Sequence, residues 1–395
     1  MRMLLPLLLA CSTPVLADAV TDWNAIGCDA VEEAKLLAPP ATEILAVVHT
    51  AIYDAVRAAP ASASRDAAIA AAARECLTKL LPSTSAKVEA AYDSAISKIP
   101  EGPAKSAGIA VGVRAASELL AKRGRASGSP PDDYRPHTTP GVYVPTVIPV
   151  MTRWAQQPPW WLRSASQFRP GPPPDLKSAL WARDFAEIRA VGAKQGGTRT
   201  EEQTRIAKFW EATGPSIYHR LVRSVADRPG RDLVRNARLF AMVSQGSTDA
   251  LIAVFDAKYH YGFWRPVTAI RNGDIDGNDA TDRDATWLPF IDTPMHPEYP
   301  CAHCILSATV GTIVEADLAG EPVPTLTSSS PTAGGATRSW TSIEAFVQEV
   351  ANARIYDGVH YRNSTEVGTA MGRKVGAWVV DAFASGSPPR SPTAP

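Results

Sequence analysis

The chain has 395 residues, of which 45% are hydrophobic and 20% are charged, so it can bury a sizeable core and is not globally disordered. Lys and Arg together number 40, as do Asp and Glu, which gives a formal net charge of zero. A non-specific nucleic-acid binder needs an excess of basic residues, so the composition disfavours a nucleic-acid partner. Any anion site must therefore be a local concentration of positive charge.

The N-terminus has the pattern of an export signal. Arg2 precedes a short apolar segment at 3–10, which is too short to span a bilayer. We predict a signal peptide at 1–17, cleaved after Ala17, and a periplasmic or secreted protein. The alternative is a lipoprotein box that ends at Cys11, which would then carry a lipid anchor. No later segment has the length and apolar character of a transmembrane helix.

Most of the remaining chain has apolar residues at helical spacing, and strand-like alternation is scarce, so the sequence predicts an all-α fold of helical bundles with long Pro-rich loops. Thr341 and Glu344 have the spacing of a capping box. The predicted helices span 41–58, 64–80, 84–97, 102–123, 176–194, 201–212, 214–226, 231–256, 301–317, 342–356 and 365–385.

A Pro- and Trp-rich segment at 126–175 interrupts the helices, because proline removes backbone donors and clashes with the preceding turn. Its three tryptophans indicate a segment that wraps the protein body rather than a solvated linker. We therefore expect an N-terminal helical region at 18–125, the wrapping segment, and a C-terminal helical region at 176–388. The two helical regions would form one integrated domain, and the second would carry the functional site.

Three segments of the C-terminal region contain what an oxyanion site needs. They read KYHYGFWRP from Lys258, HPEYPCAH from His296 and ARIYDGVH from Ala353. Lys258, Arg265 and Arg354 supply three positive charges, about what a tetrahedral oxyanion requires in a partly buried site.

Two histidines near these cations could exchange a proton with the anion or bond to it directly. His303 lies in the first turn of an apolar helix, where free backbone N–H groups and the helix dipole favour an anion, so it can exchange a proton with a bound oxyanion. His360 follows Gly358, which allows a turn, and its imidazole can attack phosphorus or ligate vanadium. A lone histidine is usually structural, but three such segments together point to a real site.

The three segments resemble the signature K-x6-R-P, P-S-G-H and S-R-x5-H of the vanadium-dependent haloperoxidases and type 2 phosphatidic acid phosphatases. The close resemblance covers about 240–385, and the segment GTRTEEQTRIAKFW at 197–210 is similar to soluble bacterial haloperoxidase-related proteins. The resemblance implies an all-helical fold. It also implies that Lys258, Arg265 and Arg354 hold vanadate or phosphate, that His303 is the acid–base residue, and that His360 is the axial vanadium ligand or the phosphorylated nucleophile.

The chain departs from that signature at several positions. Cys301 replaces Ser and Ala302 replaces Gly; Ala302 keeps its backbone N–H as an oxyanion donor, whereas the thiol of Cys301 is a weaker donor than a hydroxyl. Ser364 replaces the Asp that orients the histidine in phosphatases, and Asp357 or Glu366 could substitute for it.

Four cysteines would enter an oxidising compartment after export: Cys28, Cys76, Cys301 and Cys304. Sequence leaves a Cys28–Cys76 pairing open. For Cys301 and Cys304 we expect free thiols, because a disulfide would distort the helix turn whose N–H groups face the anion.

The neighbouring residues favour a haloperoxidase. The resemblance implies that Phe263-Trp264 is a flank typical of that branch, and that His296, a candidate halide-site residue, lies where bromoperoxidases carry His and chloroperoxidases Phe. We therefore expect a vanadate-dependent enzyme that oxidises bromide or iodide with hydrogen peroxide. The alternatives are an exported acid phosphatase that needs no cofactor and cleaves phosphomonoesters through a phosphohistidine, and a non-catalytic oxyanion-binding relative. The sequence does not fix an oligomeric state.

Overall fold

The structure, a computed structural model, describes residues 18–123 and 134–389. The predicted signal peptide and the lipidation candidate Cys11 lie outside these residues. The α-helices are α1 (Ala19–Glu33), α2 (Ala38–Ala58), α3 (Arg65–Leu80), α4 (Ser85–Ser97), α5 (Pro103–Arg123), α6 (Ala179–Val191), α7 (Glu201–Trp210), α8 (Ser216–Ala226), α9 (Leu233–Tyr261), α10 (Pro266–Arg271), α11 (Ala302–Leu318), α12 (Ile343–Tyr356) and α13 (Arg362–Ser385). A small antiparallel hairpin joins β1 (Leu326–Ser329) to β2 (Thr337–Trp340).

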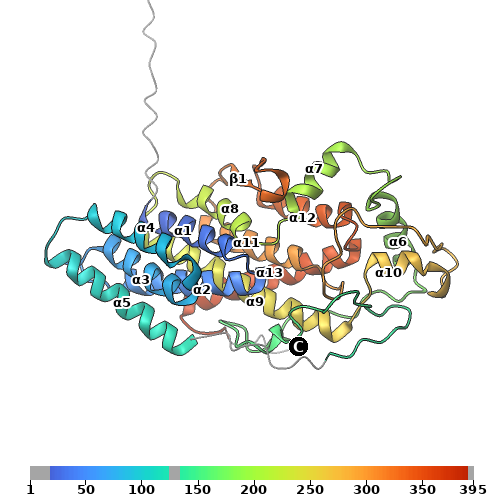
Figure 1. The fold of residues 1–395 in the computed structure, drawn as a ribbon, viewed down its shortest axis with the longest axis horizontal. Helices are drawn as coiled ribbons and strands as arrows, with labels where there is room; N and C mark the ends of the chain where they lie inside the picture. The colour runs from blue at the N-terminus through green and yellow to red at the C-terminus, as the bar shows by residue number, and fades with distance from the viewer. Residues whose placement is uncertain (1–17, 124–133, 390–395) are drawn as a thin grey trace, which may run out of the picture.

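Helix α9 is the common element of two helical bundles. On one side it packs against α2, which in turn packs on α3 and α5; on the other it packs against α11 and α13. Its 29 residues are buried over most of their length, as expected of a helix with neighbours all round. In Figure 1 the N-terminal helices lie at one end of the elongated molecule, and α6 and α10 lie at the other. The all-α fold predicted from the sequence is confirmed.

Helix α13 approaches α11 closely because glycine faces it at successive turns. A Cβ atom on Gly368 would lie 2.6 Å from the carbonyl oxygen of Cys301, and one on Gly372 would lie 2.3 Å from that of Ile305. Both distances are shorter than any real Cβ contact, so a larger side chain would push the helices apart. This contact fixes the N-terminal turn of α11, which belongs to the site described below.

The Pro- and Trp-rich segment packs on the bundles over the part that the structure describes. Buried Asp249 of α9 accepts backbone hydrogen bonds from Trp160 at 2.7 Å, Trp161 at 2.8 Å and Leu162 at 3.0 Å. Arg169 makes a second link through a bidentate ion pair with Asp256, also on α9. One carboxylate thus replaces the helix or sheet partners that this proline-rich backbone lacks.

Several local features differ from the sequence-based expectations. Helix α1 was not predicted, because its buried face includes the polar Thr21 and Asn24 and so lacks a clean apolar period. The hairpin was also missed. The expected capping box at Thr341 and Glu344 is wrong by one residue, since Ser342 caps α12 and accepts from the backbone of Ala345.

Within the described ranges, no helix is both long enough and apolar enough to cross a membrane. Cys28 and Cys76 are buried free thiols, so the pairing that the sequence left open is not formed.

Candidate oxyanion site

The end of α9 and the turn after it place two buried cations. Lys258 lies in the last turn of α9, and Gly262 ends the helix with φ of 56°, a left-handed conformation that glycine adopts readily. The chain then reverses, so that Arg265 precedes α10 and faces the same region as Lys258. Both side chains are at most 1% exposed.

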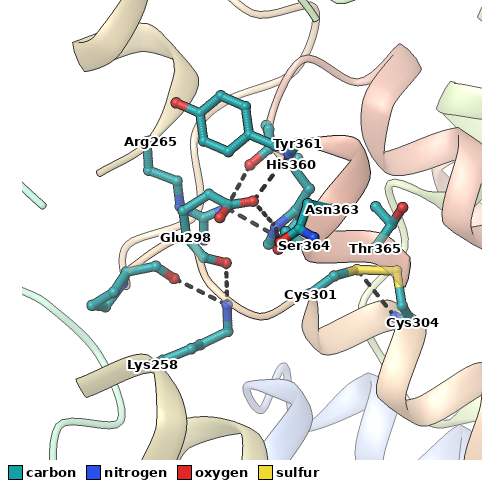
Figure 2. Close-up of polar contacts among 12 residues, drawn as sticks. Lys258, Arg265, Glu298, Cys301, Cys304, His360, Tyr361, Asn363, Ser364 and Thr365 are labelled. Carbon is teal, nitrogen blue, oxygen red and sulfur yellow. Dashed lines mark hydrogen bonds and ion pairs between the residues drawn. A yellow bond between two sulfur atoms is a disulfide. The ribbon is translucent and has the colours of Figure 1, made fainter. Parts of the chain in front are cut away.

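These two cations bind the loop that leads into α11. Lys258 Nζ donates to the carbonyl oxygens of Pro297 at 3.0 Å and Glu298 at 2.8 Å. Arg265 donates to the carbonyl of His296 through Nε at 2.9 Å and to Nδ1 of the same residue through Nη2 at 3.0 Å. Burial and the neighbouring Arg265 hold the pKa of Lys258 well below its usual range, and burial lowers the pKa of Arg265 to about 10. Figure 2 shows Lys258 directed at this loop.

The first turn of α11 supplies backbone donors and an imidazole. Helix α11 begins at Ala302, so the first N–H groups of the helix have no intrahelical acceptor and can face an anion. His303 Nε2 lies 3.2 Å from the carbonyl oxygen of Ala212; because a carbonyl only accepts, Nε2 carries the proton and Nδ1 keeps its lone pair. Burial and Arg354 hold the pKa of His303 well below its usual range.

The last turn of α12 supplies the third cation. Arg354 Nη1 donates to the carbonyl of Trp210 at 2.9 Å and to Oδ2 of Asp357 at 2.5 Å. Burial raises the pKa of Asp357 to about 7, against the effect of Arg354. Among the described residues, Nε of Arg354 has no hydrogen-bond partner although it is buried. Gly358, with φ of 79°, then turns the chain so that His360 faces back toward the site.

Glu298 is the functional residue that the sequence analysis missed. Its Oε1 lies 2.7 Å from Nδ1 of His360 and accepts the backbone N–H of Tyr361 at 3.1 Å. Both side chains are buried, and burial raises the pKa of Glu298 to about 7 while Arg265 opposes the rise. The suggested partners of His360 are therefore wrong: Asp357 pairs with Arg354, and Glu366 is exposed. Figure 2 shows the pair beside Ser364.

The carboxylate of Glu298 fixes the state of His360. Nδ1–H donates to the carboxylate, so Nε2 keeps its lone pair, and the guanidinium of Arg265 lies 3.3 Å from that atom. Burial and the cations Arg265, Lys258 and Arg354 hold the pKa of His360 well below its usual range, so the imidazole is neutral. A neutral imidazole with an unprotonated Nε2 can act as a ligand or as a nucleophile once its long contact with Arg265 gives way. The only sequence signal for Glu298 was a lone carboxylate within the HPEYP motif.

Cys301 and Cys304 form a disulfide, so the expectation of free thiols is wrong. Cys301 is the N-cap of α11 in an extended conformation, and Cys304 is the third helical residue, which brings their Cα atoms to 5.3 Å while the helix stays regular from Ala302. Sγ of Cys301 accepts the backbone N–H of Cys304 and has no proton to donate. The Cys301 side chain therefore cannot replace the serine hydroxyl as an oxyanion donor.

A cavity of about 410 Å³ opens beside these groups. His296, Ala302, His303, Arg354 and His360 line one end of it, whereas Lys258 and Arg265 lie behind the lining. Of the sequence-predicted residues, five thus line the cavity, whereas Lys258 and Arg265 donate to the loop before α11 and Cys301 lies in the disulfide. The buried carboxylates beside the three cations, Glu298 and Asp357, have pKa values raised to about 7, so positive charge can prevail at this end of the cavity and favour a bound anion.

Comparisons with known proteins agree with this geometry. Residues 238–386 match the family model described as the VCPO second helical-bundle domain. A vanadium chloroperoxidase from Curvularia inaequalis is 28% identical over a match that covers 35% of this chain and 28% of that protein. The matched part is thus well under half of either chain.

Two solved structures share the overall fold. The first bacterial vanadium-dependent iodoperoxidase superposes with a TM-score of 0.77 at 24% identity, and covers 91% of this chain and 96% of its own. An apo bacterial vanadium-dependent chloroperoxidase gives a TM-score of 0.72 at 16% identity, and covers 89% and 94%. These two likenesses show a shared fold, and the family-model match over 238–386 supports the resemblance that the three sequence segments suggested.

Proposed function

We infer that this chain, which has the fold and the second helical-bundle domain of the vanadium haloperoxidases, is a vanadate-dependent haloperoxidase that oxidises iodide or bromide with hydrogen peroxide. The observation that carries the proposal is the buried Glu298–His360 pair. It leaves a neutral Nε2 lone pair at the end of a cavity next to Arg354 and the first turn of α11. We propose the roles of Lys258, Arg265, Ala302, His303, Arg354 and His360 in that reaction.

The residues present fit vanadate. Nε of Arg354 is a buried donor without a partner in the described chain, and the N–H groups of Ala302 and His303 at the start of α11 have no intrahelical acceptor, whereas that of Cys304 is bound by Cys301 Sγ. His360 Nε2 would ligate the vanadium, and Arg354 with the Ala302 N–H would bind the oxygens. Lys258 and Arg265 would add positive charge from behind the cavity lining. When bound, vanadate would supply Lewis-acid activation of hydrogen peroxide toward halide.

The protein side chains would manage protons and position. His303 lines the cavity and presents Nδ1 as the basic nitrogen, since the carbonyl of Ala212 holds Nε2–H. It would accept a proton from peroxide and return it to the product oxygen. Its lowered pKa keeps it neutral, so Nδ1 carries a lone pair and no proton. Glu298 would hold the His360 ring and its tautomer, as carboxylates do for metal-bound histidines.

His296 supports iodide or bromide over chloride. It lines the cavity, its Nδ1 accepts from Arg265, and burial and Lys258 hold its pKa well below the usual range. A neutral, polarisable imidazole beside the halide suits a soft anion better than chloride. Its position also matches the one that carries His in bromoperoxidases.

A phosphatase is the second candidate, and Glu298 favours it. A phosphohistidine mechanism needs a carboxylate on Nδ1 of the nucleophilic histidine, which the replacement of Asp by Ser364 had seemed to remove. Bound vanadate would resemble a phosphoryl group in transfer, so the same residues suit both reactions.

One preparation assayed in two ways separates the candidates. Iodide and bromide oxidation is measured with peroxide, with and without orthovanadate, and hydrolysis of an aryl phosphate is measured in parallel. A haloperoxidase requires vanadate for the first reaction, whereas vanadate inhibits a phosphatase in the second. His360→Ala should lower whichever activity exists by about 100-fold or more, because it removes the ligand or nucleophile. Vanadate binding without either activity would favour the non-catalytic alternative.

We also propose that the protein is exported through cleavage after Ala17 and that the mature chain is one integrated domain. Asp18, the first residue after the predicted cleavage point, caps α1 by accepting from the backbone of Val20 and Thr21, so cleavage there would leave the helix cap intact. The mass of the mature protein from a native host tests this proposal. A chain that starts at Asp18 supports it, and a lipid on Cys11 contradicts it.

A further inference from the structure

The Cys301–Cys304 disulfide encloses the part of α11 that faces the proposed oxyanion. It closes a covalent ring around Ala302 and His303, both of which line the cavity. Cys301 is the N-cap of α11, and its Sγ accepts the backbone N–H of Cys304 at 3.2 Å. The disulfide therefore fixes the direction of the Ala302 and His303 N–H groups, which have no intrahelical acceptor.

The two sulfur atoms lie in a closely packed interior. Cys301 and Cys304 are fully buried and pack against Ala351 of α12. A Cβ on Gly368 of α13 would lie only 3.3 Å from Cβ of Cys301 and 3.2 Å from Cβ of Cys304. The backbone N–H of Cys301 also donates to the carbonyl oxygen of Ser364 at 3.2 Å, and Figure 2 shows the disulfide at this point of the fold. Both neighbouring helices thus contact the start of α11 through the disulfide residues.

Breaking the disulfide should move the first turn of α11. Bonded sulfur atoms lie about 2.0 Å apart, whereas nonbonded heavy atoms need roughly 3.5–4 Å. Two buried thiols gain that separation only if the turn or α13 shifts, because a packed interior has no spare room for them. Such a shift would redirect the Ala302 and His303 N–H groups and weaken their hydrogen bonds to a bound oxyanion.

The compartment of the protein decides which form of this pair exists. Cytosolic proteins keep their cysteines as thiols, whereas exported proteins meet conditions in which disulfides persist. The other two cysteines among the described residues, Cys28 and Cys76, are buried thiols. Within residues 18–123 and 134–389, a change from reducing to oxidising conditions therefore acts on the Cys301–Cys304 bond.

We propose that Cys301 and Cys304 form a redox switch of the oxyanion site: the disulfide form binds vanadate or phosphate, and the dithiol form binds them weakly. The proposal rests on the haloperoxidase function, because hydrogen peroxide, the oxidant that this function uses, also closes the pair. The switch would keep halide oxidation off in a reducing cytosol, so that hypohalous acid forms only after export.

The closing reaction balances with peroxide as the oxidant. Sγ of one cysteine bonds to a peroxide oxygen while the O–O bond breaks, and the released hydroxide takes the thiol proton and leaves as water. Sγ of the second cysteine then displaces the hydroxyl of the sulfenic acid, which leaves with the second thiol proton as water. The two sulfur atoms together lose two electrons, and peroxide gains two.

Phosphate affinity in the two redox states tests the switch, because dithiothreitol reduces vanadate but not phosphate. Calorimetry with inorganic phosphate compares untreated protein, protein opened with dithiothreitol, and opened protein that is freed of reductant and treated with hydrogen peroxide. The thiol count should rise by two and then fall by two. We expect phosphate affinity to fall by about tenfold or more on opening and to return after peroxide. Unchanged affinity, affinity that peroxide does not restore, or a disulfide that the reductant does not open in the folded protein would overturn the proposal.

Two variants separate the disulfide from the other thiols. Cys304→Ser keeps the Cys301 thiol but cannot form the bond, so it should bind phosphate as weakly as opened wild type and should not respond to dithiothreitol. The matched control combines Cys28→Ala with Cys76→Ala, keeps the disulfide, and should respond as wild type does. Circular dichroism verifies that each protein is folded. Phosphate binding that becomes tighter without the bond would mean that the Cys301 thiol is an oxyanion donor, and would overturn the switch.

The outcomes also distinguish the switch from the proposed function. Phosphate binding that is equally tight in both redox states would overturn the switch and leave the oxyanion site intact. Untreated protein that binds neither phosphate nor vanadate would overturn the oxyanion site itself. Redox-dependent phosphate affinity without vanadate-dependent halide oxidation would support the switch and overturn the haloperoxidase function instead.

Discussion

A single buried carboxylate decides what His360 can do. Without Glu298, the imidazole would lie among Arg265, Lys258 and Arg354 with only the Ser364 hydroxyl, 3.4 Å away, as an acceptor for its Nδ1 proton, so its tautomer and ring orientation would be weakly fixed. Glu298 in turn has Oε2 buried without a partner in the described chain, so the carboxylate is held through Oε1, by His360 and the backbone N–H of Tyr361, and by the surrounding cations. The cost of burying this carboxylate appears as a raised pKa of about 7.

The variant Glu298→Gln tests the cost of burying this carboxylate through the pH dependence of the unfolding free energy. The pKa of Glu298 rises from 4.5 to about 7 on folding, so its contribution stabilises the protein fully below pH 4.5 and is lost as pH rises through 7. Relative to wild type, the variant should therefore gain about 3 kcal/mol in unfolding free energy between pH 4.5 and 8. Denaturant unfolding at several pH values measures the change. A difference between the two proteins that stays constant with pH would contradict it.

At the scale of elements, the site depends on two close packing arrangements. Helix α13 holds the first turn of α11 through glycine contacts, and α9 holds the wrapping segment, which contributes Val150 and Met151 to the cavity lining. Neither arrangement involves a residue that contacts the proposed oxyanion. We therefore expect substitutions in either packing contact to change the function of the site, although these positions lie outside the three sequence segments that first indicated it.

Gly368→Ala should disturb the site without removing any of its groups. The added methyl would lie 2.6 Å from the carbonyl of Cys301, so α13 must move away from the first turn of α11, at a cost of about 1–3 kcal/mol. Vanadate or phosphate affinity, measured by calorimetry, should fall together with stability. Gly214→Ala is the control, because a Cβ there meets nothing within 4 Å. Unchanged affinity in Gly368→Ala would show that this contact does not position the cradle.

Asp249→Asn should loosen the wrapping segment. The two carboxylate oxygens accept three backbone N–H groups, and an amide offers one acceptor oxygen and one donor that faces those N–H groups. Loss of charge-assisted bonds in a buried site should cost about 2–3 kcal/mol. Proteolysis should then cut within 140–178 faster than in wild type, with the exposed Asp93→Asn as control. Cleavage at the wild-type rate would mean that the tryptophan side chains alone hold the segment.

Across the whole molecule, the sequence predicts the helices, whose apolar residues repeat at a regular spacing. Its predictions are weakest for contacts between residues that are distant in the sequence and that only the fold brings together. Most helices were predicted close to their observed limits, because their apolar period is local. Helix α1 was not, since its face toward the core carries Asn24, whose partners His49 and His219 come from α2 and α8. The same reason hid Glu298, whose role depends on a histidine 62 residues away. The disulfide was misjudged because it depends on the N-cap conformation of Cys301.

The Asn24 cluster predicts how acid acts on the molecule away from the site. Asn24 Nδ2 lies 2.9 Å from Nε2 of His49 and 2.7 Å from Nδ1 of His219, and Arg223 donates to the Asn24 carbonyl oxygen at 2.6 Å. Both imidazoles are buried between helices beside a cation, so neither gains from protonation in the folded state. Burial, with a smaller effect of Arg223, lowers the pKa of His49 from 6.5 to about 3.

We therefore expect His49→Gln to change the acid sensitivity of the protein. Because the folded pKa of His49 is depressed, the unfolded chain takes up a proton below pH 6.5 and the native state does not, so wild type loses stability as pH falls from 6.5 toward 3. By pH 5 this loss is about 2 kcal/mol, which the glutamine variant avoids while its amide oxygen can still accept from Asn24. The gap in Tm between wild type and variant should narrow or reverse between pH 7.5 and 5. The exposed His260→Gln sets the baseline for removal of one imidazole. If the Tm difference between wild type and His49→Gln equals that between wild type and His260→Gln at every pH, groups other than His49 cause the acid sensitivity.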